Sequence, residues 1–162
     1  MPRLKQLRKV VSGGQSGVDR AALDAAIEAG FATGGWCPKG RRAEDGTLPE
    51  CYLLRETPTV HYSQRTEWNV RDSDATLVLT RGDLVGGTRL TVDLARRLQR
   101  PCFVVTLVAG GEVDEVTQWL RSHQVGILNV AGPRESTRPG IYPEARQFMR
   151  KLLARVTEPA EI

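Results

Sequence analysis

Short apolar runs alternate with stretches of helical periodicity along most of the chain. The clearest runs cover residues 75–80, 102–108 and 127–130, and Val10-Val11 forms a shorter one before a glycine-rich turn. Continuous apolar runs of this length are typical of strands buried on both faces of a parallel sheet. The pattern therefore predicts buried strands at these four places.

Apolar residues with helical spacing follow these runs. Small residues from Val18 to Ala29 share one face of a helix that ends at Gly30, a position where glycine adopts the left-handed conformation. The last helix is the most regular, because apolar residues recur every three or four positions from Ala145 to Val156. Similar spacing predicts helices over residues 64–71, from Leu90 to before Pro101, and from Val113 to Leu120.

Two segments carry weaker signals. Residues 31–36 predict a strand that Gly34-Gly35 interrupts, and residues 37–60 are polar and rich in glycine and proline, which favours a loop. The whole alternation predicts one α/β domain over residues 1–162, a three-layer Rossmann-like fold with a mainly parallel sheet of about five strands. Ligands of such sheets bind at the carboxyl ends of the strands, here the loops 12–19, 36–46, 80–88 and 130–138.

Composition excludes several classes of protein. The chain has 162 residues, of which 40% are hydrophobic and 26% charged, so it contains enough apolar material for a core. No stretch approaches the roughly 18 consecutive apolar residues of a membrane span, and the basic start leads into a strand rather than a secretory signal. Three cysteines do not make a disulfide scaffold, so we expect a cytoplasmic protein with reduced thiols.

The net charge of +4 is located at one end of the chain. Arg3, Lys5, Arg8 and Lys9 stand in the first ten residues without an acid, and the remaining residues carry equal numbers of bases and acids. A basic patch on the folded body is therefore not predicted, and we expect neither a nucleic acid nor a membrane as partner.

The first predicted loop, SGGQSGVDR from Ser12 to Arg20, places three glycines between a strand and a helix. Backbone N–H groups of such a turn, together with the helix dipole, favour a phosphate. The loop has neither the Walker spacing nor G-x-G-x-x-G. The alternative is a tight turn in which Ser16 or Asp19 caps the helix.

The other three loops add polar groups at the same edge. Lys39, Arg41 and Arg42 flank Gly40 in the second loop, either to neutralise a phosphate or as a solvated surface. The third loop, residues 81–88, repeats the order strand, glycines, helix, and the fourth, residues 131–140, holds polar groups between prolines.

Catalytic and metal-binding patterns are absent from these loops. His61 and His123 lie outside them, and the cysteines show no ligand spacing, so we predict no metal site. The acids of the loops remain candidates for acid–base chemistry: Glu44, Asp45, Asp83 and Glu135.

Five ordered motifs, GGQSGVDRAALDAA, GWCPKGRRAEDG, EWNVRDSDATLVL, GGTRLT and LNVAGPRES, together resemble the putative molybdenum carrier family. This is a circularly permuted branch of the SLOG group of Rossmann-like nucleotide-binding proteins. The resemblance extends from about Val10 to about Val156. It implies a homo-oligomer, a dimer or tetramer, and a cleft for a nucleotide or for molybdopterin, the phosphorylated pterin of molybdenum cofactor.

The resemblance also implies which residues bind the ligand. They belong to the first glycine turn, the basic loop, the segment before the strand at 75–80, the second glycine turn and the loop after the strand at 127–130. These residues are Gly13, Gly14, Gln15, Ser16, Gly17, Asp19, Arg20, Lys39, Gly40, Arg41, Asn69, Asp74, Gly86, Gly87, Thr88, Gly132, Arg134, Glu135 and Ser136.

One departure from the wider group concerns catalysis. SLOG relatives that hydrolyse cytokinin-type nucleotides resemble a Gly-Gly-x-Gly-Thr-x-x-Glu pattern, and Thr91 stands here in place of the glutamate. A threonine hydroxyl does not serve as a carboxylate base near neutral pH. We therefore expect a binding or carrier protein rather than an enzyme. The alternatives are a nucleotide or nucleotide-sugar hydrolase, with Glu135 as candidate catalyst, and an interaction module without a small ligand.

Overall fold

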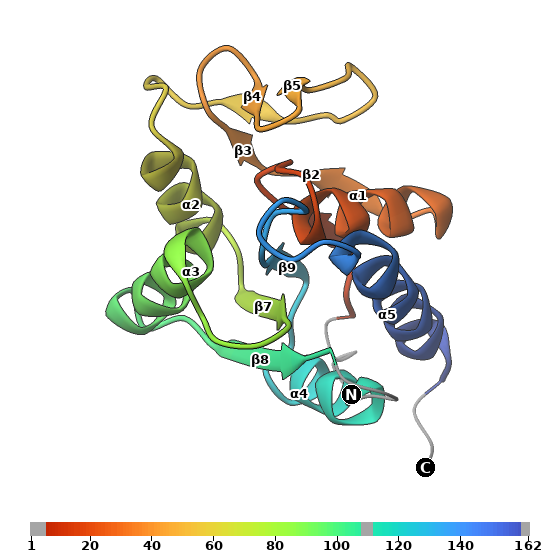
Figure 1. Cartoon of the computed structure of the whole chain (residues 1–162). Coiled ribbons are helices and arrows are strands. Elements are labelled where there is room, and N and C mark those ends of the chain that lie inside the picture. The colour runs from red at the N-terminus through yellow and green to blue at the C-terminus, as the bar shows by residue number, and fades with distance from the viewer. Residues whose placement is uncertain (1–5, 108–111, 160–162) are drawn as a thin grey trace.

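Five parallel strands form the main sheet and bring distant parts of the chain together (Figure 1). The structure is a computed structural model that describes residues 6–107 and 112–159. The strands follow the order β2-β1-β9-β7-β8, and each neighbouring pair is parallel. Their bounds are Lys9–Val11 (β1), Ala32–Gly34 (β2), Ala75–Thr80 (β7), Cys102–Thr106 (β8) and Ile127–Ala131 (β9).

Helices cover both faces of the sheet, which gives the three layers predicted for an α/β Rossmann-like fold. In Figure 1, α1, α4 and α5 lie on one side, and α2 and α3 pack against each other on the other. The helices are α1 Val18–Glu28, α2 Tyr62–Arg71, α3 Gly86–Arg97, α4 Val113–Ser122 and α5 Ile141–Thr157. The predicted fold class is confirmed.

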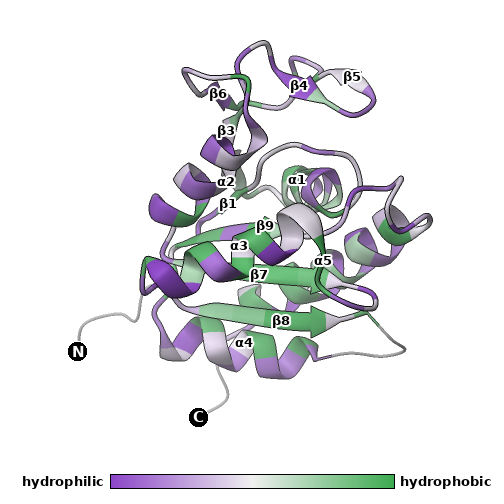
Figure 2. Ribbon diagram, turned by 60° about the vertical axis from the view of Figure 1, so that its left-hand side comes forward, coloured by the Kyte–Doolittle hydropathy of each residue, from purple (hydrophilic) through white to green (hydrophobic). Residues whose placement is uncertain are grey.

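The core follows from the apolar pattern. All six residues of β7 are buried, and the small face of α1, including Ala22 and Ala26, packs with the apolar face of α5 in one cluster. Figure 2 shows β7 and β8 as hydrophobic strands and the helices as amphipathic. A smaller cluster of Val70, Leu94 and Ala95 joins α2 and α3. Small side chains on α1 allow close packing of α1 against α5.

The second predicted strand is divided in the structure. Only Ala32–Gly34 joins the main sheet as β2, whereas Trp36–Cys37 forms β3 and pairs with Arg55–Glu56, β6. Gly35 adopts a φ of 125°, a value that ends the extended run between β2 and β3. The predicted strand at 102–108 ends at Thr106 in the structure, and Val108 lies outside the described residues.

Residues 37–60 are more ordered than a polar loop. They contain an antiparallel pair, β4 Arg42–Ala43 with β5 Gly46–Thr47, and a small core that Leu48, Tyr52 and Leu54 form with Leu23 of α1. We call residues 38–54 the hairpin segment. It lies over the start of α1 (Figure 1).

The strand order places β9 between β1 and β7. The connections from β1 and from β7 run to opposite edges of the sheet, so the loops after β1, β7 and β9 border one crevice, the usual ligand site of such sheets. Within the residues that the structure describes, no helix is both long and apolar enough to cross a membrane.

Candidate functional site

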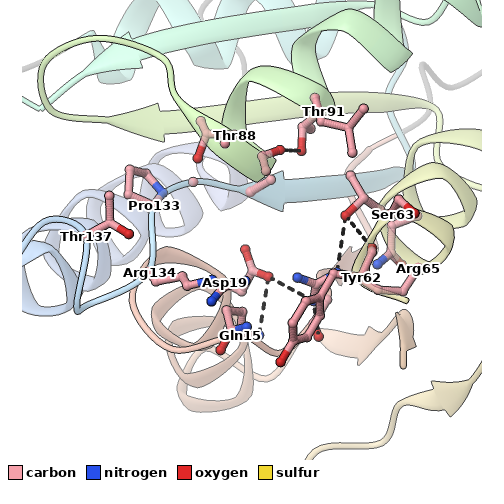
Figure 3. Close-up of a pocket in the computed structure, with 18 of the residues that line it drawn as sticks. Gln15, Asp19, Tyr62, Ser63, Arg65, Thr88, Thr91, Pro133, Arg134 and Thr137 are labelled. Carbon is pink, nitrogen blue, oxygen red and sulfur yellow. Dashed lines mark hydrogen bonds and ion pairs between the residues drawn. The ribbon is translucent and has the colours of Figure 1, made fainter. Parts of the chain in front are cut away.

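A cavity of about 280 Å³ lies at this crevice. Its walls come from the turn after β1, the start of α2, the start of α3 and the loop after β9 (Figure 3). Its size is near the lower end of the roughly 300–1,000 Å³ typical of small-molecule sites. The cavity is thus suited to a compact ligand.

The structure brings ten of the nineteen predicted binding residues to the wall of this cavity. Nine others lie elsewhere, and their surroundings are described below. The ten are Gly13, Gln15, Asp19, Asn69, Gly86, Gly87, Thr88, Gly132, Arg134 and Ser136.

Four N–H groups of the first glycine turn donate to acceptors within the protein. The N–H of Gly14 donates to Ser12 Oγ at 3.2 Å, that of Gln15 to Asp19 Oδ2 at 3.3 Å, and that of Ser16 to Gln15 Oε1 at 3.1 Å. The N–H of Val18 donates to the carbonyl of Pro133. An anion bound by these four N–H groups would have to replace their acceptors, whereas the N–H groups of Gly13, Gly17 and Asp19 have none among the described residues.

Close packing explains the glycines of this turn. A Cβ on Gly13 would lie 2.2 Å from Arg65 Nη1, and one on Gly14 would lie 2.6 Å from Leu54 Cδ1. A Cβ on Gly17 would lie 2.4 Å from the Pro133 carbonyl oxygen. These three glycines therefore serve contacts within the protein. The predicted cap by Ser16 or Asp19 is wrong, because Gly17 is the N-cap of α1 and no side chain caps the helix. A Gly14→Val variant would disrupt the packing of the hairpin segment whether or not a ligand binds.

Asp19 and Arg65 form a buried ion pair in the cavity wall, with Oδ2 and Nη1 3.7 Å apart. Arg65 Nη1 also donates to the Gly13 carbonyl at 2.8 Å. Burial raises the pKa of Asp19 to about 6, although Arg65, the Gln15 N–H, Arg20 and Arg134 each lower it. Burial thus outweighs the nearby cations.

The Asp19 carboxyl should make the stability of the fold depend on pH. Its pKa is about 6 in the fold against an ordinary 3.8, so the fold binds the proton more tightly than the unfolded chain does. Lowering the pH from 7 to 4 should therefore stabilise the wild type by about 2 kcal/mol relative to Asp19→Asn. Urea unfolding at several pH values measures this difference. Asp93→Asn, at a partly exposed position of α3, is the control, and parallel profiles for wild type and Asp19→Asn would contradict the expectation.

The hairpin segment holds Gln15 in one orientation. Glu44 donates its backbone N–H to Gln15 Oε1 at 2.7 Å, and its carboxylate accepts hydrogen bonds from the hydroxyls of Ser16 and Ser136. Burial would raise the pKa of Glu44, but the hydrogen bonds from Ser136 and Ser16 lower it. Gln15 Nε2 is buried and has no partner among the described residues.

The start of α3 is open to the cavity. No side chain caps this helix, and neither Gly86 nor Gly87 would bring a Cβ within 4 Å of another described atom. The first N–H groups of a helix have no acceptor within the helix, and here the described residues supply none for Gly86, Gly87 and Thr88. This turn leaves three consecutive donors free for a ligand, whereas the first turn gives acceptors to the N–H groups of Gly14, Gln15, Ser16 and Val18.

The basic loop does not face the cavity. The Arg41 guanidinium donates to the carbonyls of Leu48, Pro49, Tyr52 and Leu54, at 2.8 to 3.4 Å. Those four carbonyls turn inward because the segment curls around the side chain. Arg41, predicted as a ligand-binding residue, does not line the cavity, since the guanidinium is used to close the hairpin segment.

Neighbours of Arg41 and of the first turn are also placed outside the cavity. Lys39 and Gly40 are exposed, and the Gly40 N–H donates to Glu56. Arg20 pairs with Asp45 and donates to the Gly14 carbonyl at 3.0 Å, which ties the hairpin segment to α1. These side chains brace the first turn from outside.

Three further predicted residues have structural partners. Asp74 lies before β7, at the opposite edge of the sheet, and accepts the N–H groups of Gly126 and Ile127 at 2.9 and 2.8 Å. Asn69 lines the cavity, but its side chain is hydrogen-bonded to Trp36: Oδ1 accepts the Trp36 N–H, and Nδ2 donates to the Trp36 carbonyl. Glu135 accepts the N–H groups of Gly140 and Tyr142 and so caps α5. Its carboxylate is therefore engaged at a helix terminus.

Sequence reasoning missed the wall formed by α2. Tyr62, Ser63, Arg65 and Thr66 line the cavity, and the guanidinium carbons of Arg65 and Arg134 lie 5.2 and 4.9 Å from the centre of the Tyr62 ring. The sequence contained one indication of this wall, a pair of polar residues at helical spacing: Arg65 and Asn69 stand four residues apart on one face of a helix. Both are buried there, where a core would require apolar side chains.

The described residues contain no group of three or more His, Cys, Asp or Glu side chains placed to hold a metal ion. Asp19 is the one acidic side chain among the described residues that line the cavity. With Arg65 and Arg134 in the same wall, two cations face one carboxylate. The cavity has an excess of positive charge that favours an anion.

Comparisons with known proteins agree with this architecture. The sequence model of the circularly permutated YpsA SLOG family matches residues 10–153. A crystal structure of a protein named "Putative molybdenum carrier protein" from Syntrophus aciditrophicus SB is 42% identical, with a TM-score of 0.85. The match covers 92% of this chain and 96% of that chain. No curated protein matches the sequence.

Proposed function

Because the chain belongs to the circularly permutated YpsA SLOG family, we propose that it binds a phosphorylated heterocycle in the cavity between α1, α2 and α3. The ligand is a nucleotide or molybdopterin, and the protein acts as a carrier or binding protein. The similar protein from Syntrophus aciditrophicus bears a molybdenum carrier name, which supports the second of these ligands.

The open start of α3 carries this proposal. Three consecutive N–H groups without an acceptor, at the positive end of a helix dipole, favour a phosphate. Gly86 and Gly87 have no side chain, so a phosphate oxygen can approach the backbone closely. The phosphate thus binds at the second glycine turn, rather than at the first turn around Gly17.

The cavity residues fit a phosphorylated heterocycle on two further grounds. Gln15 Nε2 is a buried donor without an acceptor, and a polar ring supplies one. Arg134 lines the cavity and adds positive charge. The described residues contain no group of three or more metal-ligating side chains, so for a molybdenum cofactor the chain would hold the ring and the phosphate.

The binding proposal also accounts for the acids better than a hydrolase does. Glu135, the candidate catalyst, is engaged in capping α5. Thr91 lines the cavity, but its hydroxyl donates to the Gly87 carbonyl at 2.8 Å. Asp19 is the remaining acid of the wall, and it is paired with Arg65. Turnover of a nucleotide by wild type that is lost in Asp19→Asn would favour the hydrolase instead.

Two measurements test the proposed function. Mass spectrometry of the denatured, freshly purified protein identifies a ligand that copurifies, and we expect a pterin phosphate or a nucleotide. Calorimetric titration of ligand-free protein with nucleoside monophosphates and pterin phosphates measures binding directly. Binding without release of base or phosphate supports a carrier, whereas the absence of binding to every phosphorylated ring contradicts the proposal.

Arg134 should contribute a salt-dependent part of the affinity. A hydrogen bond to a charged group contributes about 1.5–3 kcal/mol, so Arg134→Met should weaken binding of a nucleoside monophosphate by about tenfold or more at low salt. The difference should shrink as salt rises, because ions screen the attraction. Arg97→Met, at the exposed end of α3, is the control for loss of one positive charge. Equal affinities of wild type and Arg134→Met at low salt would place the anion elsewhere.

A further inference from the structure

The side-chain amide of Gln15 is fixed by its surroundings. Its Oε1 accepts two backbone N–H groups, from Ser16 at 3.1 Å and from Glu44 at 2.7 Å. Exchanging the oxygen and the nitrogen of the amide would bring an NH2 group against both donors, so the assignment is unambiguous. Nε2 is therefore the free end of the amide, and it is a donor.

This donor lacks an acceptor although it is buried. Gln15 is 3% exposed, lines the cavity, and has no acceptor for Nε2 among the described residues. Polar groups buried in native structures are nearly always paired. A donor fixed by its other end and left without a partner at a cavity wall points to an acceptor on a ligand.

Asp19 provides the complementary group beside Gln15. Its Oδ2 accepts the Gln15 N–H and faces Arg65, whereas Oδ1 accepts no hydrogen bond from the described residues. Figure 3 shows Gln15 and Asp19 on the wall opposite Thr88 and Thr91 of α3. One wall thus offers a donor next to an acceptor, and the opposite wall offers the open helix start.

We propose that Gln15 and Asp19 recognise the heterocycle by a lactam edge, a ring carbonyl beside a ring N–H. Gln15 Nε2 donates to the carbonyl oxygen, and Asp19 Oδ1 accepts the ring N–H. Hypoxanthine, guanine and pterins carry this edge. The inference rests on the proposed function, because a phosphate bound at α3 turns the ring toward the Gln15 wall and sets which ring atoms meet the two side chains.

The same pair disfavours the reversed edge. Adenine has an amino group where hypoxanthine has the carbonyl, and a ring nitrogen with a lone pair where hypoxanthine has the N–H. In the same position the amino group of adenine, a donor, would face the donor Gln15 Nε2. Its ring nitrogen, an acceptor, would face the acceptor Asp19 Oδ1. A site that hydrogen-bonds one pattern rejects the other because its polar groups are then left unpaired. We expect at least about a tenfold preference.

Three compounds separate the roles of phosphate and ring. Calorimetry should give wild type an affinity for inosine 5′-monophosphate about tenfold or more above that for adenosine 5′-monophosphate. Ribose 5-phosphate, which has no base, should bind more weakly than the inosine compound. Gln15→Glu keeps an acceptor for both N–H groups but removes the donor, so the ratio of inosine to adenosine affinity should fall to about one. The exposed Gln147→Glu on α5 is the matched control and should keep the wild-type ratio.

The outcomes distinguish this inference from the proposed function. Equal affinities of wild type for the two nucleotides, tighter binding of the adenosine compound, or an unchanged ratio in a folded Gln15→Glu protein would overturn the lactam assignment while phosphate binding stands. No binding of any of the three compounds would overturn both. If Gln15→Glu fails to fold, Asp19→Asn provides the second variant, in which the inosine preference should also fall, and an unchanged preference would again overturn the assignment.

Discussion

Replacing Arg65 with methionine is expected to destabilise the folded chain by about 3–5 kcal/mol at neutral pH. The guanidinium is buried, bonds the Gly13 carbonyl at 2.8 Å and pairs with Asp19 at 3.7 Å. Methionine keeps most of the length of the side chain but leaves the Asp19 carboxylate buried without its nearest countercharge. Urea unfolding followed by circular dichroism measures the loss.

Acid should reduce this loss. Because the pKa of Asp19 is raised to about 6, the carboxyl becomes neutral below that pH and no longer requires a cation. The destabilisation by Arg65→Met should therefore be smaller at pH 5 than at pH 7.5, and Asp19→Asn combined with Arg65→Met should recover part of it at neutral pH. The control is Arg97→Met, an exposed arginine. A loss below about 1 kcal/mol at pH 7.5 would show that the pair contributes no more than a surface ion pair.

Substitution of Gly87 should reduce ligand binding without harming the fold. A Cβ at this position meets no other described atom within 4 Å, and no positive φ occurs there. Alanine in place of a helical glycine stabilises by about 0.5–1 kcal/mol. The added methyl group should nevertheless occupy the space through which, in the proposed function, a phosphate approaches the N–H groups of α3.

The expected loss of affinity increases with the size of the side chain introduced at position 87. Gly87→Ala should weaken binding of a nucleoside monophosphate by about tenfold and Gly87→Val by about 100-fold, from the loss of one or more charge-assisted hydrogen bonds. Thermal unfolding should show that both variants are folded, and Arg97→Ala is the control on the same helix. Wild-type affinity in a folded Gly87→Val protein would exclude the start of α3 as the phosphate site.

Strong apolar patterns predicted the framework well. The strand predicted over residues 75–80 is β7 with the same bounds, because a run buried on both faces admits few alternatives. Gly30, at a φ of 79°, follows the end of α1 as predicted. Two-residue strands have too few positions to show a period, so β4, β5 and β6 were not predicted within the polar segment. These strands are held in place by the bonds between Arg41 and four carbonyls and by the small core beneath them. Local sequence spacing does not show either of these contacts.

Polar residues were harder to place. Sequence spacing indicates that a loop lies at the right edge of the sheet, but it does not indicate which acceptor a cation or an N–H group meets. The Arg41 side chain therefore bonds carbonyls of its own segment, and the Glu135 carboxylate accepts N–H groups at the start of α5, although both residues stand in predicted site loops. Arg65 was missed for the converse reason, because its helix comes from outside those loops and reaches the cavity through tertiary packing.

The two glycine turns illustrate the same limit. Both follow a strand and precede a helix, and each loop contains three glycines. Only three-dimensional packing separates them: Gly14 and Gly17 lie against other parts of the chain, whereas Gly86 and Gly87 face open space. Choosing the phosphate site therefore requires knowing which N–H groups already have acceptors.

A backbone amide NMR titration of the 17.9 kDa chain with inosine 5′-monophosphate tests the phosphate site most directly. The account predicts that the largest shifts occur for the amides of Gly86, Gly87 and Thr88, which gain phosphate acceptors. The amides of Gly14 and Ser16 already have acceptors and should change little. Largest shifts in the first turn, or no shifts at the start of α3 at saturating ligand, would contradict the account.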